Sequence, residues 1–358
     1  WETARQKFQA IDWKNGGAKL YAGSSTYTVF VSPYSTGFAG RKELAEASTV
    51  KELEQGKFSG KILLLHGEIA QEQLMPKNFI FYNPPEHQRM ISLLEESGAA
   101  ALICATGRNA SLAGGVYPFP LLEDGDFDIP SVYMTEEEGK NLLPHTGEQV
   151  ELYSLSERIP GTGCNMIGIK GGNGTERIVV TAHIDAKKGT PGAIDNATGV
   201  TVLLILAELL HQYAGNKQIE LVALNGEDYY SVPGQMKYIA ENQDRFSSIA
   251  LNINIDGAAY KSGKTSFSFF DLSEEMEKKA REILSRQPAI VEGVQWPQGD
   301  HSIFLQHGIP AIAVSSRWFI DNMETQDITH TPKDNVTIVD YDTIIVIAEA
   351  IHALIRKL

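Results

Sequence analysis

One stretch of this sequence places one imidazole and two carboxylates between two apolar runs. Residues 178–210 read IVVTAHIDAKKGTPGAIDNATGVTVLLILAELL. The first run ends at His183, Asp185 follows two residues later, and Asp195 lies twelve residues after the histidine. The second run then begins with its apolar residues at helical spacing. Because charges are costly to bury without partners, these three side chains point to a site rather than to packing.

The sequence on either side of this stretch alternates between strands and helices from about residue 156. We predict strands in MIGIKGGNGTERIVVTAH, QIELVALNG, SSIALNINID, KTSFSFF and IPAIAVSS, and helices in TGVTVLLILAELLHQYA, SEEMEKKAREILSR and VDYDTIIVIAEAIHALIRKL. The first of these segments looks like a hairpin that turns at Gly171–Gly174. Alternation of this kind predicts an α/β fold with a mostly parallel central sheet, flanked by helices on both faces.

The length of 358 residues is about right for two domains. Residues 17–155 are mostly short strands and turns, and we predict that they form a β-rich insert. Residues 1–16 would then supply the first strand of the larger domain, which continues through 156–358.

Composition narrows the possible partners of the chain. The net charge of −14 argues against nucleic acid, since phosphate binding needs a basic face. The longest apolar stretch, VTVLLILA, is too short for a membrane span. The two cysteines, Cys104 and Cys164, show no CxxC spacing, so histidines and carboxylates would have to hold any metal. Nothing in the sequence indicates an oligomeric state.

Potential metal ligands follow strand after strand. Ligands of open α/β sheets bind outside the carboxyl ends of the strands. The groups just past the predicted strands are His183, Asp195, Glu227, Asp228, Asp256 and His330. Two histidines and three aspartates suit a pair of divalent cations: two Zn²⁺ by default, with Mn²⁺ or Co²⁺ able to use the same ligands. Asp195 is the natural bridge, because its loop lies between the other ligands.

Two further carboxylates remain for other roles. Glu227 stands next to a ligand, and a carboxylate within reach of a metal-bound water is what a general base requires. Asp185 is expected to accept the second ring N–H of His183 and so fix its tautomer. Asp195 or Asn196 is expected to cap the backbone N–H groups where the next helix begins.

Taken together, these motifs resemble zinc aminopeptidases of metallopeptidase family 28. The motifs match in order: H-x-D at 183–185, G-A-x-D-N at 192–196, G-E-[ED] at 226–228, N-x-D at 254–256, D-H at 300–301 and H-T-x-x-D at 330–334. The resemblance covers roughly 156–358. It implies that one zinc takes His183, Asp195 and Asp256, that the other takes Asp195, Asp228 and His330, and that Glu227 is the base.

The expected substrate pocket is less sharply defined. Asp300 and His301 match a family motif near the pocket, and they either line it or make a structural bond. Several members carry a tyrosine where Thr329 stands, to assist the oxyanion. Tyr229, Tyr230 and the metals are candidates for that role here. Members also commonly have glutamate at the position of Asp228, whose side chain is one methylene shorter.

The insert resembles a protease-associated domain. The residues that carry this resemblance are SGKILLL (59–65), SGAAALI (97–103) and IPSVYMTEEEG (129–139). In the family such a domain lies near the mouth of the active site and restricts substrates.

We therefore predict a zinc metallopeptidase that removes N-terminal residues from peptides with a free N-terminus. One alternative within the fold is a glutaminyl cyclase-like enzyme with a single zinc. Another is a carboxypeptidase- or dipeptidase-like enzyme, for which Arg317 is the only arginine near the pocket in sequence. An alternative of another class is a non-catalytic, transferrin receptor-like binding ectodomain. We expect an extracytoplasmic location, secreted or in the cell envelope, with the cytoplasm as the alternative.

Overall fold

The computed structural model describes residues 1–80, 83–106, 121–172, 174–296, 298–323 and 325–358. The chain divides into two compact units: Trp1–Phe8 with Thr162–Leu358, and Gln9–Gly161. Two long strands, β1 (Glu2–Ala22) and β8 (Gln149–Lys170), contribute residues to both units. The units therefore divide within these strands, after Phe8 and after Gly161, whereas the predicted boundaries lie after residues 16 and 155.

The sheet of the larger unit is mostly parallel, which confirms the predicted α/β class. Its strand order is β13-β12-β14-β11-β9-β10-β8. The neighbours β10, β9, β11 and β14 run parallel, as do β12 and β13, whereas β8 and β12 run antiparallel to β10 and β14. The strands are β9 (Arg177–His183), β10 (Gln218–Leu224), β11 (Ile249–Ile255), β12 (Thr265–Phe270), β13 (Ile290–Glu292) and β14 (Ala311–Ser316).

The predicted hairpin at Gly171–Gly174 is wrong. Strand β10 lies between β8 and β9, because Val222 pairs with Ile167 on one side and with Thr181 on the other. The glycines let the chain reverse, but the position beside β9 is filled by a strand that follows later in the chain. Strand β9 is buried along its whole length, as a central parallel strand should be.

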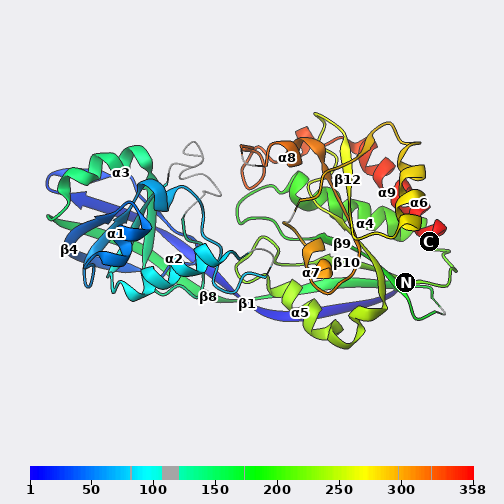
Figure 1. Ribbon diagram of the computed structural model, residues 1–358, viewed down its shortest axis with the longest axis horizontal. Helices are drawn as coiled ribbons and strands as arrows, with labels where there is room; N and C mark the ends of the chain where they lie inside the picture. The colour runs from blue at the N-terminus through cyan, green and yellow to red at the C-terminus, as the bar shows by residue number, and fades with distance from the viewer. Residues whose placement is uncertain (81–82, 107–120, 173, 297, 324) are drawn as a thin grey trace. The chain divides into compact units, whose positions relative to one another are not determined.

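Helices cover both faces of this sheet. Figure 1 shows α4, α6 and α9 on one side of strands β9 and β10, and α5 and α7 on the other. The first group packs its apolar residues, such as Leu206, Ile283 and Ile351, against Val180 and Ile253 of the sheet. The helices are α4 (Thr198–Leu209), α5 (Pro233–Asn242), α6 (Glu274–Leu284), α7 (His301–Leu305), α8 (Arg317–Asp321) and α9 (Tyr341–Lys357).

The smaller unit has its own sheet, in the order β8-β4-β5-β6-β7-β3, with β4 through β7 parallel. Its described elements include β2 (Ser25–Tyr27), β3 (Phe30–Val31), β4 (Phe38–Ala47), β5 (Ile62–Leu65), β6 (Ala101–Thr106), β7 (Ser131–Thr135), α1 (Val50–Gln55), α2 (Pro85–Glu96) and α3 (Glu136–Leu142). Its assignment as a protease-associated domain stays a prediction. Across the described residues, none of the helices has the length and apolarity that a bilayer span requires.

A buried ion pair joins the first residue of β9 to β10. The Arg177 guanidinium donates to the Glu220 carboxylate at 2.7 Å and to the Asn242 side chain at 3.0 Å. The Tyr238 hydroxyl donates to the other Glu220 oxygen at 3.1 Å. Both charged side chains are almost fully buried. The pair lies at the amino end of β9, opposite to the end that carries His183.

We expect Arg177→Met to cost about 3–5 kcal/mol in the free energy of unfolding, because it leaves Glu220 buried without its counter-charge. Urea denaturation followed by circular dichroism measures this. Arg286→Met is the matched control: Arg286 pairs with Glu282 on the surface, and its loss should cost about 1 kcal/mol or less. Equal losses in both variants would contradict the buried role.

Candidate metal centre

Strand β9 delivers His183 to the carboxyl edge of the sheet. The side chain is 1% exposed, and its Nδ1 donates to the backbone carbonyl of Asp185 at 3.1 Å. This bond leaves Nε2 facing Asp195 at 3.0 Å and Asp256 at 3.3 Å. Asp185 therefore accepts the second ring N–H of His183, but through its backbone oxygen, while its carboxylate oxygen lies 3.9 Å from Nδ1.

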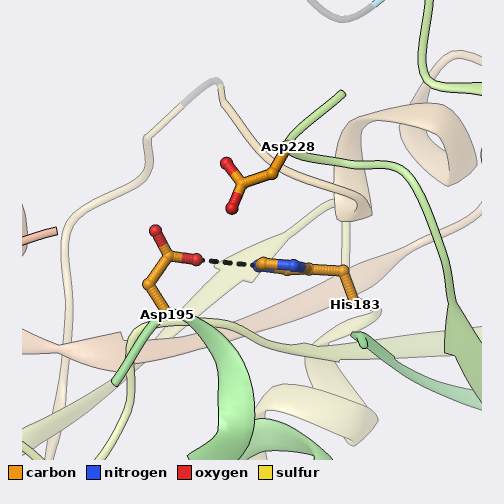
Figure 2. A group of neighbouring side chains, drawn as sticks. All are labelled: His183, Asp195 and Asp228. Atoms are coloured by element: carbon orange, nitrogen blue, oxygen red, sulfur yellow. Dashed lines mark ion pairs between the residues drawn. The ribbon is translucent and has the colours of Figure 1, made fainter. Parts of the chain in front are cut away.

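Asp195 lies between the two histidines. Its Oδ1 is 3.0 Å from Nε2 of His183, and its Oδ2 is 3.1 Å from Nε2 of His330. His330 also lies 2.9 Å from Oδ1 of Asp228. Figure 2 shows the side chains of Asp195 and Asp228 pointing toward the ring of His183. The side chains thus form two groups of three that share Asp195. The first group is His183, Asp195 and Asp256, and the second is His330, Asp195 and Asp228.

The donor set fits divalent cations of the zinc type. Ligand atoms of His183, Asp195 and Asp228 all lie within 4.8 Å of one another. One oxygen of Asp228, Oδ2, is buried and has no hydrogen-bond partner among the described residues. A buried carboxylate oxygen in that state needs a positive partner. Imidazole nitrogens with carboxylate oxygens are the ligands that zinc accepts.

The pKa values follow from this crowding of charge. Burial lowers the pKa of both imidazoles, but the carboxylates outweigh it. Asp256 and Asp195 raise the pKa of His183 well above its ordinary value, and Asp228 and Asp195 raise that of His330 to about 10. Burial also opposes the ionisation of Asp195, yet its bonds to both histidines lower its pKa. The shared aspartate is therefore ionised.

Glu227 lies in the loop that joins β10 to α5. Burial raises its pKa well above the ordinary value, and the charges of Asp228 and Asp256 add to this effect while His183 opposes it. The side chain is partly exposed, so it can meet a molecule that enters the site. A carboxylate with a raised pKa beside a metal centre is suited to accept and return a proton.

Two acidic side chains hold the turns that carry the candidate ligands. The Asp185 carboxylate accepts the backbone N–H groups of Gly226 at 2.5 Å, Glu227 at 3.3 Å and Asp228 at 3.0 Å. Asp334 is fully buried, and its carboxylate accepts the N–H groups of residues 194 and 195 at 2.6 and 3.1 Å. Asp334 closes the H-T-x-x-D motif, but its role in holding this turn was not predicted from the sequence.

The turn around Asp195 also carries the helix cap. Asn196 accepts the N–H of Gly199 at 3.0 Å and donates to the backbone carbonyl of Ile255 at 2.8 Å. Of the two residues expected to cap this helix, Asn196 is the one whose side chain accepts an amide of the first turn of α4, although Ala197 is the residue at the N-cap position. The second bond ties this turn to the end of β11, next to Asp256.

The four residues expected to line a substrate pocket divide into two pairs. Asp300 accepts from Gln235 at 2.8 Å, and His301 is bonded to the backbone carbonyl of Trp296 at 3.0 Å. Both are essentially unexposed, which supports the structural alternative for this pair. Tyr229 and Thr329 are partly exposed, and the Thr329 hydroxyl accepts from Gln326 at 2.6 Å.

An α/β sheet with a buried histidine–aspartate cluster at its carboxyl edge is typical of metal-dependent enzymes. The family follows from comparison with known proteins. The model of "Peptidase family M28" matches residues 165–355, more than half of the chain. The chain belongs to this family, which confirms the predicted resemblance.

Among curated proteins, the chain is similar to aminopeptidase YwaD of Bacillus subtilis. The two are 24% identical over 261 residues, 68% of this chain and 53% of that protein. It is also similar to the probable lipoprotein aminopeptidase LpqL of Mycobacterium tuberculosis, at 26% identity over 55% of this chain and 38% of that one. The chain thus spans about half the length of the first relative and 38% of the length of the second.

Solved structures share the fold over nearly the whole chain. An aminopeptidase from Aneurinibacillus sp. strain AM-1 matches with a TM-score of 0.77 at 20% identity, covering 99% of this chain and 84% of that one. BSAP, described as a zinc aminopeptidase from Bacillus subtilis, matches with a TM-score of 0.72 at 19% identity over the same shares. At such identities the likeness concerns the fold.

We expect zinc binding to release protons, because His330 is charged at neutral pH before a cation binds and must be neutral afterwards. Its raised pKa stabilises the cation-free fold fully below pH 6.5, and this contribution is lost as the pH rises through 10. Calorimetric titration with zinc at pH 7.5, in buffers of different ionisation enthalpy, counts the protons. His330→Ala should release about one proton fewer than the wild type on binding zinc. Equal proton release from both proteins would contradict the assignment of His330 as a ligand.

Proposed function

We propose that this chain is a zinc-dependent aminopeptidase that uses two zinc ions and takes Glu227 as its general base. The observation that carries the proposal is the position of Asp195, which presents one carboxylate oxygen to each histidine. His183 and Asp256 would hold one ion with it, and His330 and Asp228 the other. The family, and the printed names of the relatives, support hydrolysis of peptides at the N-terminus.

Two zinc ions held there would polarise the scissile carbonyl and make the attacking water more acidic. The chain's own residues account for the remaining steps. Glu227 accepts the proton of the attacking water and returns it to the leaving amine. The Nδ1 bond of His183 to the backbone directs its Nε2 into the site. The hydrogen bonds that the carboxylates of Asp185 and Asp334 accept from backbone amides hold the turns of Glu227 and Asp195 in one position.

The other functions left open by the sequence receive less support. A carboxypeptidase needs a guanidinium for the substrate carboxylate, but Arg317 pairs with Asp321 on its own helix at 2.7 Å. A single-zinc cyclase would leave one of the two groups of three without a cation. A receptor-like role gives no reason to gather every candidate ligand and Glu227 in one place.

Glu227→Gln should lower kcat by a factor on the order of 10²–10⁴ while leaving zinc binding unchanged, because the amide cannot accept the proton. Stopped-flow or plate kinetics with an aminoacyl-anilide, together with metal analysis of the same sample, give both quantities. Glu349→Gln, on the exposed face of α9, is the control and should turn over like the wild type. Near-normal turnover of Glu227→Gln would remove this residue from the mechanism.

A panel of aminoacyl-anilides, each with its N-acetylated counterpart, tests the reaction class. We expect hydrolysis of the free amines only, loss of activity on chelation, and recovery with about two zinc ions per chain. One ion per chain, with cyclisation of N-terminal glutamine, would replace the proposal by the cyclase. No hydrolysis of any free-amine substrate would overturn the aminopeptidase.

A further inference from the structure

The loop that carries Glu227 and Asp228 closes on itself. It leaves β10 at Asn225 and enters α5 at Pro233, so that Gly234 lies in the first turn of the helix. A Cβ atom added to Gly234 would lie 2.1 Å from the backbone oxygen of Asn225, so the two ends of the loop are in direct contact. Compact surface loops with touching ends often carry function. Here the closure depends on a residue without a side chain at position 234.

The side chain of Asn165 holds the two ends of the loop together. Asn165, on β8, is fully buried, and its Oδ1 accepts the N–H of Asn225 at 3.0 Å. Its Nδ2 donates to the backbone oxygen of Gly234 at 2.7 Å and to Oε1 of Gln6 at 3.1 Å. The carbonyl and both amide hydrogens are therefore used, and two of the three bonds go to opposite ends of one loop.

The loop needs such support because part of its backbone is strained. Ser231 and Val232 have φ values of 69° and 38°, and Val232 is a buried β-branched residue. Non-glycine residues with such φ values are unfavourable and persist only where their surroundings hold them. The bond from Asn165 to Gly234 lies two residues beyond this strained pair.

We infer that Asn165 is a positioning residue for Glu227 and Asp228. It holds the ends of the loop, while Asp185 holds the three amides at its tip. The role assigned to Glu227 rests on the proposed function, but the hold on the loop does not. Asn165 acts through the backbone and touches neither Glu227 nor the candidate ligands. A shift of about 1 Å in a reacting group can cost on the order of 10² in rate, so a looser loop should lower turnover.

Two substitutions separate this role from general stability. Asn165→Asp keeps the size and the bond to Asn225 but turns the two donated bonds into contacts between acceptors. Asn165→Ala removes all three bonds. Gln6→Ala is the control, because it removes a buried partner of Asn165 and leaves both loop bonds in place. We expect both Asn165 variants to lower kcat by roughly tenfold or more. Gln6→Ala should lower the melting temperature with kcat unchanged at 25 °C.

Hydrogen exchange followed by mass spectrometry gives a readout that does not need activity. In both Asn165 variants, peptides covering 225–234 should exchange faster, while those of β9 and β10 stay protected. Zinc affinity, measured by competition with a chromophoric chelator, should fall, because this loop positions the candidate ligand Asp228. Gln6→Ala should show neither change.

Wild-type exchange within 225–234 at the rate of an unstructured loop would overturn the inference even if no Asn165 variant folds. Unchanged exchange and unchanged zinc affinity in folded Asn165 variants would overturn it as well. If the wild-type protein cleaves no free-amine substrate, but the Asn165 variants still show the expected changes in exchange and zinc affinity, the aminopeptidase proposal fails and the positioning role stands.

Discussion

Like charge crowded into a small, largely buried volume is the constraint on which the rest of this structure depends. Asp195, Asp228 and Asp256 lie with Glu227 around the imidazoles of His183 and His330, and the Lys187 ammonium lies 4.0 Å from Asp228. Burial raises the pKa of Glu227 and of Asp256, and the neighbouring carboxylates add to it. Such an arrangement is stable when cations of higher charge share the space, and zinc ions would supply that charge.

Side chains from outside the candidate ligand set hold the turns in place. Asp185 accepts three amides of the Glu227 turn, and Asp334 accepts two amides of the Asp195 turn. Asn196 ties that same turn to the end of β11. Backbone amides are donors of fixed direction, so each turn has little freedom to rotate. The precision of the site therefore comes from backbone bonds as much as from the candidate ligands themselves.

Much of this could be predicted because strand ends and metal ligands leave strong local patterns. The end of β9 at His183 and the helix α6 within residues 273–286 were both readable from the residues. The pairing order of the strands was not readable. The turn before β9 shows that the chain reverses, but not that β10, a later strand, lies between β8 and β9. The bonds from the Asp185 carboxylate to the amides of residues 226–228 were not predictable, since sequence spacing favours a neighbouring side chain over a distant backbone. Asn165 was missed for the same reason.

The division of the larger unit into two separated segments has a consequence during synthesis. The Trp1 indole donates to the backbone of Ala207, and Gln6 meets Asn165, across separations of 206 and 159 positions. At about 5–20 residues per second, the first strand waits on the order of ten seconds or more for these partners. An unpaired strand is a template for aggregation, and charged residues discourage it. Glu2, Arg5 and Lys7 are exposed charged residues of that segment, so the ribosome releases an edge that other chains are slow to join.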